Sequence, residues 1–288
     1  MSVDAPTARI ALTFDNLGEA AEEELGEPVA RGGHLSVTQV LPVVLKLLDS
    51  VGLKATFFVE AINTERYPDA LRRVIDDGHE LGCHGWRHET FSAQTEPRKR
   101  ELLAASTRAL RAMGAAVTGF RPPGGALAGN DLRLLAGAGL DWASPAGTVA
   151  GEVAGVACLP FRWPLIDAYF FAPPLAPLRV RDGLTAEPTA PGYFADAIAR
   201  AIDGALDNEA ETPLCVVLHP YLYTSESRLR ALEELVLRLG RLRARGEAIV
   251  GPGREIAADL RARGAHLTAP VLDASSWATS VSADQEHR

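Results

Sequence analysis

The sequence predicts an α/β fold in which helices cover a parallel sheet, built either as a barrel or as a large open sheet. Short apolar runs typical of strands alternate with helical runs about seven times, which implies parallel strands joined by right-handed crossovers. The chain has 288 residues, of which 47% are hydrophobic, enough for one large core. The run PLCVVLHP (213–220) is apolar without alternation, as expected of a strand covered on both faces.

The first half of the chain supplies strand and helix patterns in alternation. The strand ARIALTFD (8–15) precedes a helix over 36–52, where Ser36 and Gln39 suit a capping box and Pro42 predicts a kink or a later start. The elements expected next are a strand over 54–60, a helix over 67–78 closed by Gly78, a strand over 79–85, a helix over 96–113 capped by Thr95 and stopped by Gly114, and an extended segment over 118–125.

The second half continues the alternation. The expected elements are a helix over 131–139, a short extended segment over 140–144, a strand over 155–163, a helix over 193–206, the strand over 213–220, a helix over 225–243, a strand over 247–250 and a helix over 253–264. We expect an N-terminal extension over 1–7, one domain over 8–268 and a mobile tail over 269–288, which is poor in bulky apolar residues.

Charge and composition exclude several classes of function. The chain carries 37 acidic and 29 basic side chains, a net charge of −8, which argues against binding to nucleic acid or to an anionic membrane. The start MSVDAPTARI is too polar for a signal peptide, and no apolar run approaches the roughly 20 residues of a membrane span. Three cysteines without C-x-x-C spacing favour a cytoplasmic, reduced protein. The oligomeric state stays open, a homo-oligomer included.

Four chemically useful residues stand at or just beyond the ends of different predicted strands. They are Asp15, His84, Arg121 and His219. In a parallel barrel the chemistry lies at the carboxyl ends of the strands, so these side chains are predicted to converge.

The spacing of His84 and His88 allows both imidazoles to face one metal ion. Zinc favours imidazole nitrogen, and a catalytic zinc site usually has three protein ligands and a water. Because the chain has seven histidines, two unrelated surface histidines remain the alternative. Arg121, held extended by the prolines after it, suits a carboxylate, whereas His219 alone could equally be a satisfied core residue.

The motifs LTFDN, HGWRH, FRPPGG, LDWAS and LHP, in this order, resemble the signature motifs of the NodB-type polysaccharide deacetylases, carbohydrate esterase family four. The resemblance covers residues 8–265, and GHELGCHGWRHE and LPFRWPLIDAYFF are most similar to the cytoplasmic branch of allantoinase-like and intracellular peptidoglycan-deacetylase-like members. It implies a single-domain, distorted (β/α)7 barrel.

The resemblance also implies a role for each motif residue. Asp15 would be the general base, oriented by Arg121, and His219 the general acid, with Asp141 setting its tautomer. The implied ligands of a divalent metal, zinc by preference, are His84, His88 and Asn16, and the backbone N–H near Gly124 would hold the oxyanion.

Three features leave alternatives open. The family usually has aspartate where this chain has Asn16, so the amide ligates the metal, or Asp15 becomes a ligand, or the metal binds poorly. Gly124 replaces a common tyrosine, which removes an aromatic wall. Asp167 could partner His219 in place of Asp141.

The predicted function is metal-dependent hydrolysis of a non-peptide carbon–nitrogen bond, by preference N-deacetylation of a sugar or sugar-containing metabolite. Trp86, Trp163 and Tyr221 could stack on a sugar ring, with barrel packing as the alternative. Two other functions compete: ring opening of a cyclic amide or ureide, and, because of Asn16, ligand binding by a family member without catalysis.

Overall fold

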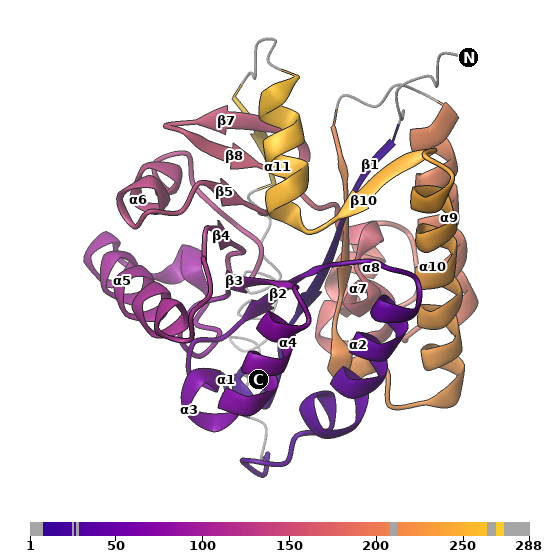
Figure 1. The fold of residues 1–288 in the computed structure, drawn as a ribbon, viewed down its shortest axis with the longest axis horizontal. Helices are drawn as coiled ribbons and strands as arrows, with labels where there is room; N and C mark the ends of the chain where they lie inside the picture. Colours follow the sequence, from indigo (N-terminus) through magenta and orange to yellow (C-terminus); the bar gives the residue numbers. More distant parts are fainter. Residues whose placement is uncertain (1–7, 25, 27–28, 208–211, 264–268, 274–288) are drawn as a thin grey trace.

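The barrel predicted from the sequence is present in the computed structural model (Figure 1), which describes residues 8–24, 26, 29–207, 212–263 and 269–273. The predicted extension over 1–7 lies outside these residues, as do 274–288 of the predicted tail. In the described part of the chain, no helix is long and apolar enough to cross a membrane.

The central sheet is built around β1 (Ala8–Asp15), which is almost entirely buried. Its parallel neighbours are β2 (Thr56–Val59), β9 (Leu214–Leu218) and β10 (Ala248–Gly251). From β2 the parallel sheet continues through β3 (Glu80–Cys83), β4 (Gly119–Phe120) and β5 (Trp142–Ala143).

Two isolated parallel bridges carry the sheet from β5 back to β1. Ala146 pairs with Phe161, and Ile166 pairs with Val217 of β9. The ring therefore runs β1, β2, β3, β4, β5, the segment 161–166 and β9. This irregular closure is the distorted (β/α)7 barrel expected from the sequence, and it confirms a single domain.

Helices surround the sheet and fill the connections between strands (Figure 1). They are α1 (Ala20–Glu24), α2 (Leu41–Ser50), α3 (Asn63–Arg66), α4 (Pro68–Asp76), α5 (Glu96–Ala112), α6 (Asp131–Gly137), α7 (Asp167–Phe171), α8 (Ala176–Arg181), α9 (Pro191–Asp207), α10 (Glu226–Ala244) and α11 (Gly253–Ala262). Short 3-10 turns lie at 91–93, 163–165, 173–175 and 220–222.

Neither of the two predicted helix caps makes a side-chain capping hydrogen bond in the structure. A π-helical turn, Ser36–Val40, precedes α2, whose first turn contains Pro42, so the later start is confirmed. Ser36 makes no capping hydrogen bond; its hydroxyl accepts one from the Gly18 N–H at 2.9 Å. Thr95 is the N-cap residue of α5, as predicted, but its side chain makes no capping hydrogen bond.

The segment after β5 is more irregular than the single strand predicted over 155–163. It forms β6 (Gly147–Val149), β7 (Gly151–Val153) and β8 (Val156–Cys158), with β7 antiparallel to β8. Against the prediction of a mobile tail from residue 269, β11 (Val271–Leu272) pairs with β6. Gly147 allows this approach, because a Cβ there would lie 2.5 Å from the Val271 carbonyl oxygen.

Candidate active site

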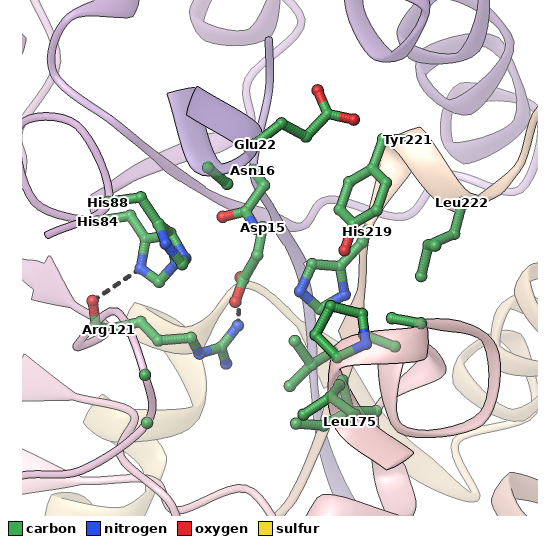
Figure 2. A pocket seen from close by; sticks show the side chains of 18 of the residues that line it. Asp15, Asn16, Glu22, His84, His88, Arg121, Leu175, His219, Tyr221 and Leu222 are labelled. Atoms are coloured by element: carbon green, nitrogen blue, oxygen red, sulfur yellow. Dashed lines mark hydrogen bonds and ion pairs between the residues drawn. The ribbon is translucent and has the colours of Figure 1, made fainter. Parts of the chain in front are cut away.

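A cavity of about 380 Å³ opens at the carboxyl ends of the barrel strands (Figure 2). Of the residues singled out from the sequence, those that line it are Asp15, Asn16, His84, His88, Arg121, Gly124, Trp163, His219 and Tyr221. The structure thus brings together side chains from the first half of the chain and from β9. Trp86, Asp141 and Asp167 are not among the lining residues.

Asp15 and Arg121 form a buried ion pair on the cavity wall. Arg121 Nη1 lies 2.5 Å from Asp15 Oδ1 and also donates to Thr13 Oγ1 at 2.8 Å. Its Nη2 donates to Ser144 Oγ at 2.8 Å, and its guanidinium lies 4.4 Å from the centre of the Phe58 ring. This network holds the Asp15 carboxylate in one orientation, with the positive charge of Arg121 satisfied by several acceptors.

His84 and His88 lie side by side on one side of Asp15 (Figure 2). Their ring centres are 4.9 Å apart, and His84 Nδ1 is 2.8 Å from the Arg121 carbonyl oxygen, which leaves His84 Nε2 for a ligand. Burial lowers the pKa of His84 to about 3, and burial together with His84 and His219 lowers that of His88 well below its ordinary value. Both rings are therefore neutral at pH 7, the form in which imidazole binds a metal.

Backbone strain is concentrated at two of the predicted metal ligands. Among the described residues other than glycine, only Asn16 (φ 59°), His88 (φ 71°) and Ala154 (φ 56°) have positive φ. The left-handed conformation is unfavourable for side chains with a Cβ, and strained residues cluster at functional sites. The Asn16 side-chain oxygen is buried and has no hydrogen-bond partner within the described chain.

His219 lies on the opposite side of Asp15 (Figure 2), and Asp167 holds its ring. Its Nδ1 is 2.6 Å from Asp167 Oδ1, and its backbone N–H donates to Asp167 Oδ2 at 2.6 Å. Burial alone would lower the pKa of His219, but the charge and hydrogen bond of Asp167, with help from Asp15, raise it above its ordinary value. His219 can thus carry a proton on Nε2, while Nδ1 is fixed by the carboxylate.

The structure corrects the choice of Asp141 as the partner of His219. Asp141 is exposed and immediately precedes β5, so it lies at the amino end of that strand, away from the cavity. Asp167, by contrast, follows the bridge between Ile166 and Val217, which sets it beside β9 and His219. Asp167, the alternative partner that the sequence motifs left open, is the residue that contacts His219.

Sequence reasoning missed Glu60, which lies with His84 and His88. One ligating atom from each of the three side chains falls within 4.8 Å of the others. Glu60 is fully buried, and burial, then Asp15 and Glu89, raise its pKa well above its ordinary value. Its position directly after β2, at the same barrel edge as Asp15, was the signal that could have found it.

These residues fit a divalent metal. Two neutral imidazoles are available, and two buried oxygens, Asn16 Oδ1 and Glu60 Oε1, accept no hydrogen bond from another described residue. Buried polar atoms normally have partners, so such atoms beside paired histidines indicate a cation site.

The remaining predicted residues lie either at the cavity or against the hydrophobic core. Gly124 and Gly125 both have φ of 84°, and Gly125 packs closely against Phe161 and Trp163. Trp163 lines the cavity, and Tyr221 packs edge-on against His219 with ring centres 5.6 Å apart. Trp86, half-buried, packs against the hydrophobic core instead, so the packing alternative holds for that residue.

Comparisons with known proteins agree with the geometry. Residues 2–143 match the model of the polysaccharide deacetylase family. A peptidoglycan deacetylase of Helicobacter pylori is 31% identical over 109 residues, which are 37% of this chain and 36% of the relative. The chain therefore spans only about a third of the length of this relative.

Two solved structures share the fold over nearly the whole chain. A Mycobacterium smegmatis protein with a provisional description as a polysaccharide deacetylase has a TM-score of 0.76 at 23% identity, covering 95% of this chain and 96% of its own. Puue allantoinase has a TM-score of 0.70 at 20% identity, covering 90% and 93%.

The matched segment contains Asp15, His84, His88 and Arg121. It ends before His219, which lines the same cavity, and before Asp167, which contacts His219. On this match, residues 2–143 belong to the polysaccharide deacetylase family, and the solved structures show that nearly the whole chain shares their fold.

Proposed function

We propose that the protein is a metal-dependent amide hydrolase that removes the acetyl group from an N-acetylated sugar or sugar-containing metabolite. One observation carries the proposal: Asp15 lies between the His84–His88 pair and His219 in a single cavity (Figure 2), and Asp167 contacts His219 from behind the cavity wall. A base, an acid and a cation site around one space are the parts that amide hydrolysis needs.

In this proposal Asp15 and His219 move the protons. Asp15, oriented by Arg121, accepts a proton from the attacking water. His219, whose pKa is raised chiefly by Asp167 against the effect of burial, donates a proton to the departing nitrogen. Because His219 lies to one side of Asp15, water activation and protonation of the leaving nitrogen can come from different directions.

His84 and His88, with Asn16 as the predicted third ligand, would hold the divalent metal. When bound, such an ion polarises the amide carbonyl and lowers the pKa of water, and zinc suits the two imidazoles. The backbone N–H at Gly124, on the cavity wall, would add a donor for the oxyanion.

The cavity favours a small substrate or a single sugar unit. Its volume of about 380 Å³ is near the lower end of the roughly 300–1,000 Å³ usual for small-molecule sites. Trp163 and Tyr221 offer aromatic faces, and Trp163 Nε1 donates no hydrogen bond to a described residue. The buried, unpaired Cys83, Cys158 and Cys215 support a reducing, cytoplasmic setting.

A cyclic amide or ureide is the second candidate substrate, because apolar residues form much of the cavity wall. Pro173, Pro174, Leu175 and Leu222 are among the lining residues. A compact ring with few hydroxyl groups would suit this wall better than a polar sugar.

The test is turnover by the purified chain after chelation and after loading with zinc. We expect acetate release from N-acetylated sugars, such as N-acetylglucosamine and its short oligomers, only with zinc, and its loss in Asp15→Asn. Ring opening of cyclic ureides without acetate release would establish the second candidate. Zinc binding without turnover of either substrate class would contradict the enzymatic proposal.

A further inference from the structure

We propose that Glu60 is the carboxylate ligand of the metal, completing a His84–His88–Glu60 donor set in which Asn16 is not the essential third ligand. The inference rests on the metal centre of the proposed function and specifies how this chain, which lacks a carboxylate at position 16, builds that centre. It assigns a role to a residue that no sequence motif identified.

The barrel backbone fixes Glu60 beside His84. In the parallel pair β2–β3, Val59 is opposite Cys83, and the His84 N–H donates to the Val59 carbonyl at 3.0 Å. Two residues after Val59, the Ala61 N–H donates to the Gly85 carbonyl at 3.0 Å. Because hydrogen bonds hold the backbone on both sides of Glu60, its position does not depend on a flexible loop.

The side chain is buried toward the two histidines. One Glu60 carboxylate oxygen belongs to the group of ligating atoms that lie within 4.8 Å of one another, with one nitrogen each from His84 and His88. Glu60 is 0% exposed, and its Oε1 accepts no hydrogen bond from another described residue. A buried carboxylate oxygen without a donor is costly unless a cation occupies the space that it faces.

Charge distinguishes Glu60 from the other nearby oxygens. Asn16 is neutral, and Asp15 is already paired with Arg121 at 2.5 Å. Glu60 has no described basic partner at salt-bridge distance, so its carboxylate is available to balance a divalent ion held by two neutral imidazoles. With Glu60 as the ligand, Asp15 remains available as the base.

A purely structural role for Glu60 makes a different prediction. Glu60 Oε2 accepts a hydrogen bond from Asn63 Nδ2 at 3.2 Å, and Asn63 Nδ2 also donates to the Leu17 carbonyl at 2.6 Å. Glutamine at position 60 could keep the acceptor for Asn63. It would therefore preserve a structural role but remove the charge that a metal ligand needs.

The experiment is a competition titration of the metal-free full chain with Zn²⁺, independent of turnover. We expect Glu60→Gln to weaken zinc binding by at least the roughly 10–100-fold that loss of a supporting residue costs, and Glu60→Asp to weaken it less. Asn16→Asp in the Glu60→Gln background should restore much of the affinity, because it returns one carboxylate to the site.

Glu80→Gln is the matched control. Glu80 is a buried glutamate at the start of β3, bound by Thr56 Oγ1 at 2.6 Å and Trp142 Nε1 at 3.1 Å, away from the cavity. We expect its zinc affinity to equal that of the wild type. Wild-type affinity in folded Glu60→Gln or Glu60→Asp, or no zinc binding by the wild type, would overturn the inference. Failure to hydrolyse amides while these affinities follow the expected order would instead contradict the proposed function.

Discussion

Three buried histidines lie around Asp15, but their pKa values shift in opposite directions. His84 and His88 lie on one side of Asp15, and His219 lies on the other. Burial lowers the pKa of His84 to about 3 and that of His88 well below its ordinary value. Burial acts on His219 too, but Asp167 outweighs it and the pKa rises. The partner of the second ring nitrogen makes the difference: a carbonyl oxygen for His84, a buried carboxylate for His219.

This comparison shows how one barrel rim can separate two chemical roles. A histidine kept neutral has a lone pair for a metal, whereas a histidine kept protonated has a proton for a leaving group. The strand that delivers each side chain decides which partner it meets. His84 follows β3 beside Glu60, and His219 follows β9 beside Asp167.

Removing one histidine from each side should produce the largest and most distinct effects. We expect His84→Ala to lose the bound metal and, with it, activity down to background, because a zinc site needs its imidazoles. His219→Ala should keep the metal while kcat falls by roughly 10²–10⁴-fold, the usual contribution of a general acid. Elemental analysis and steady-state kinetics of both proteins check this; equal metal loss in both would contradict separate roles.

Replacing Asp167 should lower the pKa of His219, in the direction of the lowered pKa values of His84 and His88. In Asp167→Asn the negative charge is lost, so the pKa of His219 falls and its proton is lost at lower pH. The descending limb of kcat/KM on the basic side should therefore move to lower pH, and activity above the new limb should drop by roughly 10-fold or more. Zinc affinity should change little.

Asp141→Asn is the control for that experiment. Asp141 is exposed, and its position before β5 sets it at the far end of the strand. We expect its pH profile to overlay that of the wild type. A displaced profile in Asp141→Asn with an unmoved one in Asp167→Asn would reverse the assignment of the partner.

The strand patterns predict a parallel α/β fold, built as a barrel or an open sheet, and the family resemblance implies the barrel. The convergence of Asp15, His84, Arg121 and His219 was predictable because strand patterns locate the carboxyl ends. It does not distinguish Asp141 from Asp167, since only the irregular bridge between Ile166 and Val217 brings the latter to His219. Parallel bridges of one residue leave no repeating pattern in a sequence.

Glu60 was missed for a related reason. A glutamate after an apolar run looks like the exposed end of a strand, since glutamate is seldom fully buried. Its significance comes from lying next to His84 through the register of β2 and β3, and strand register is a tertiary property. The path of 269–273 back to β6 is similarly long-range, and a local shortage of apolar residues therefore predicted a tail.

The smallest expected effect is on the free energy of unfolding. Its pH dependence should also differ between the His84–His88 side and the His219 side of Asp15. In the metal-free protein, His84 and His88 have folded pKa values below the ordinary 6.5, so the unfolded chain binds protons that the folded chain does not. Stability should fall as pH drops below 6.5, toward the pKa of His84 at about 3, by up to about 1.4 kcal/mol per pH unit for each histidine.

His219 should affect stability in the opposite pH range. Its folded pKa is raised, so its contribution is fully present below its unfolded pKa and is lost as pH rises through the folded value. Urea unfolding of the metal-free protein from pH 5 to 8 measures how the free energy of unfolding depends on pH. The double replacement His84→Gln with His88→Gln should flatten the fall in this free energy at acidic pH. His219→Gln should remove only its decline at higher pH. His79, buried elsewhere with a pKa lowered to about 4, supplies the same acidic slope to every variant. If the replacements on both sides of Asp15 changed the acidic fall in the free energy of unfolding equally, the histidines on the two sides would not differ in protonation.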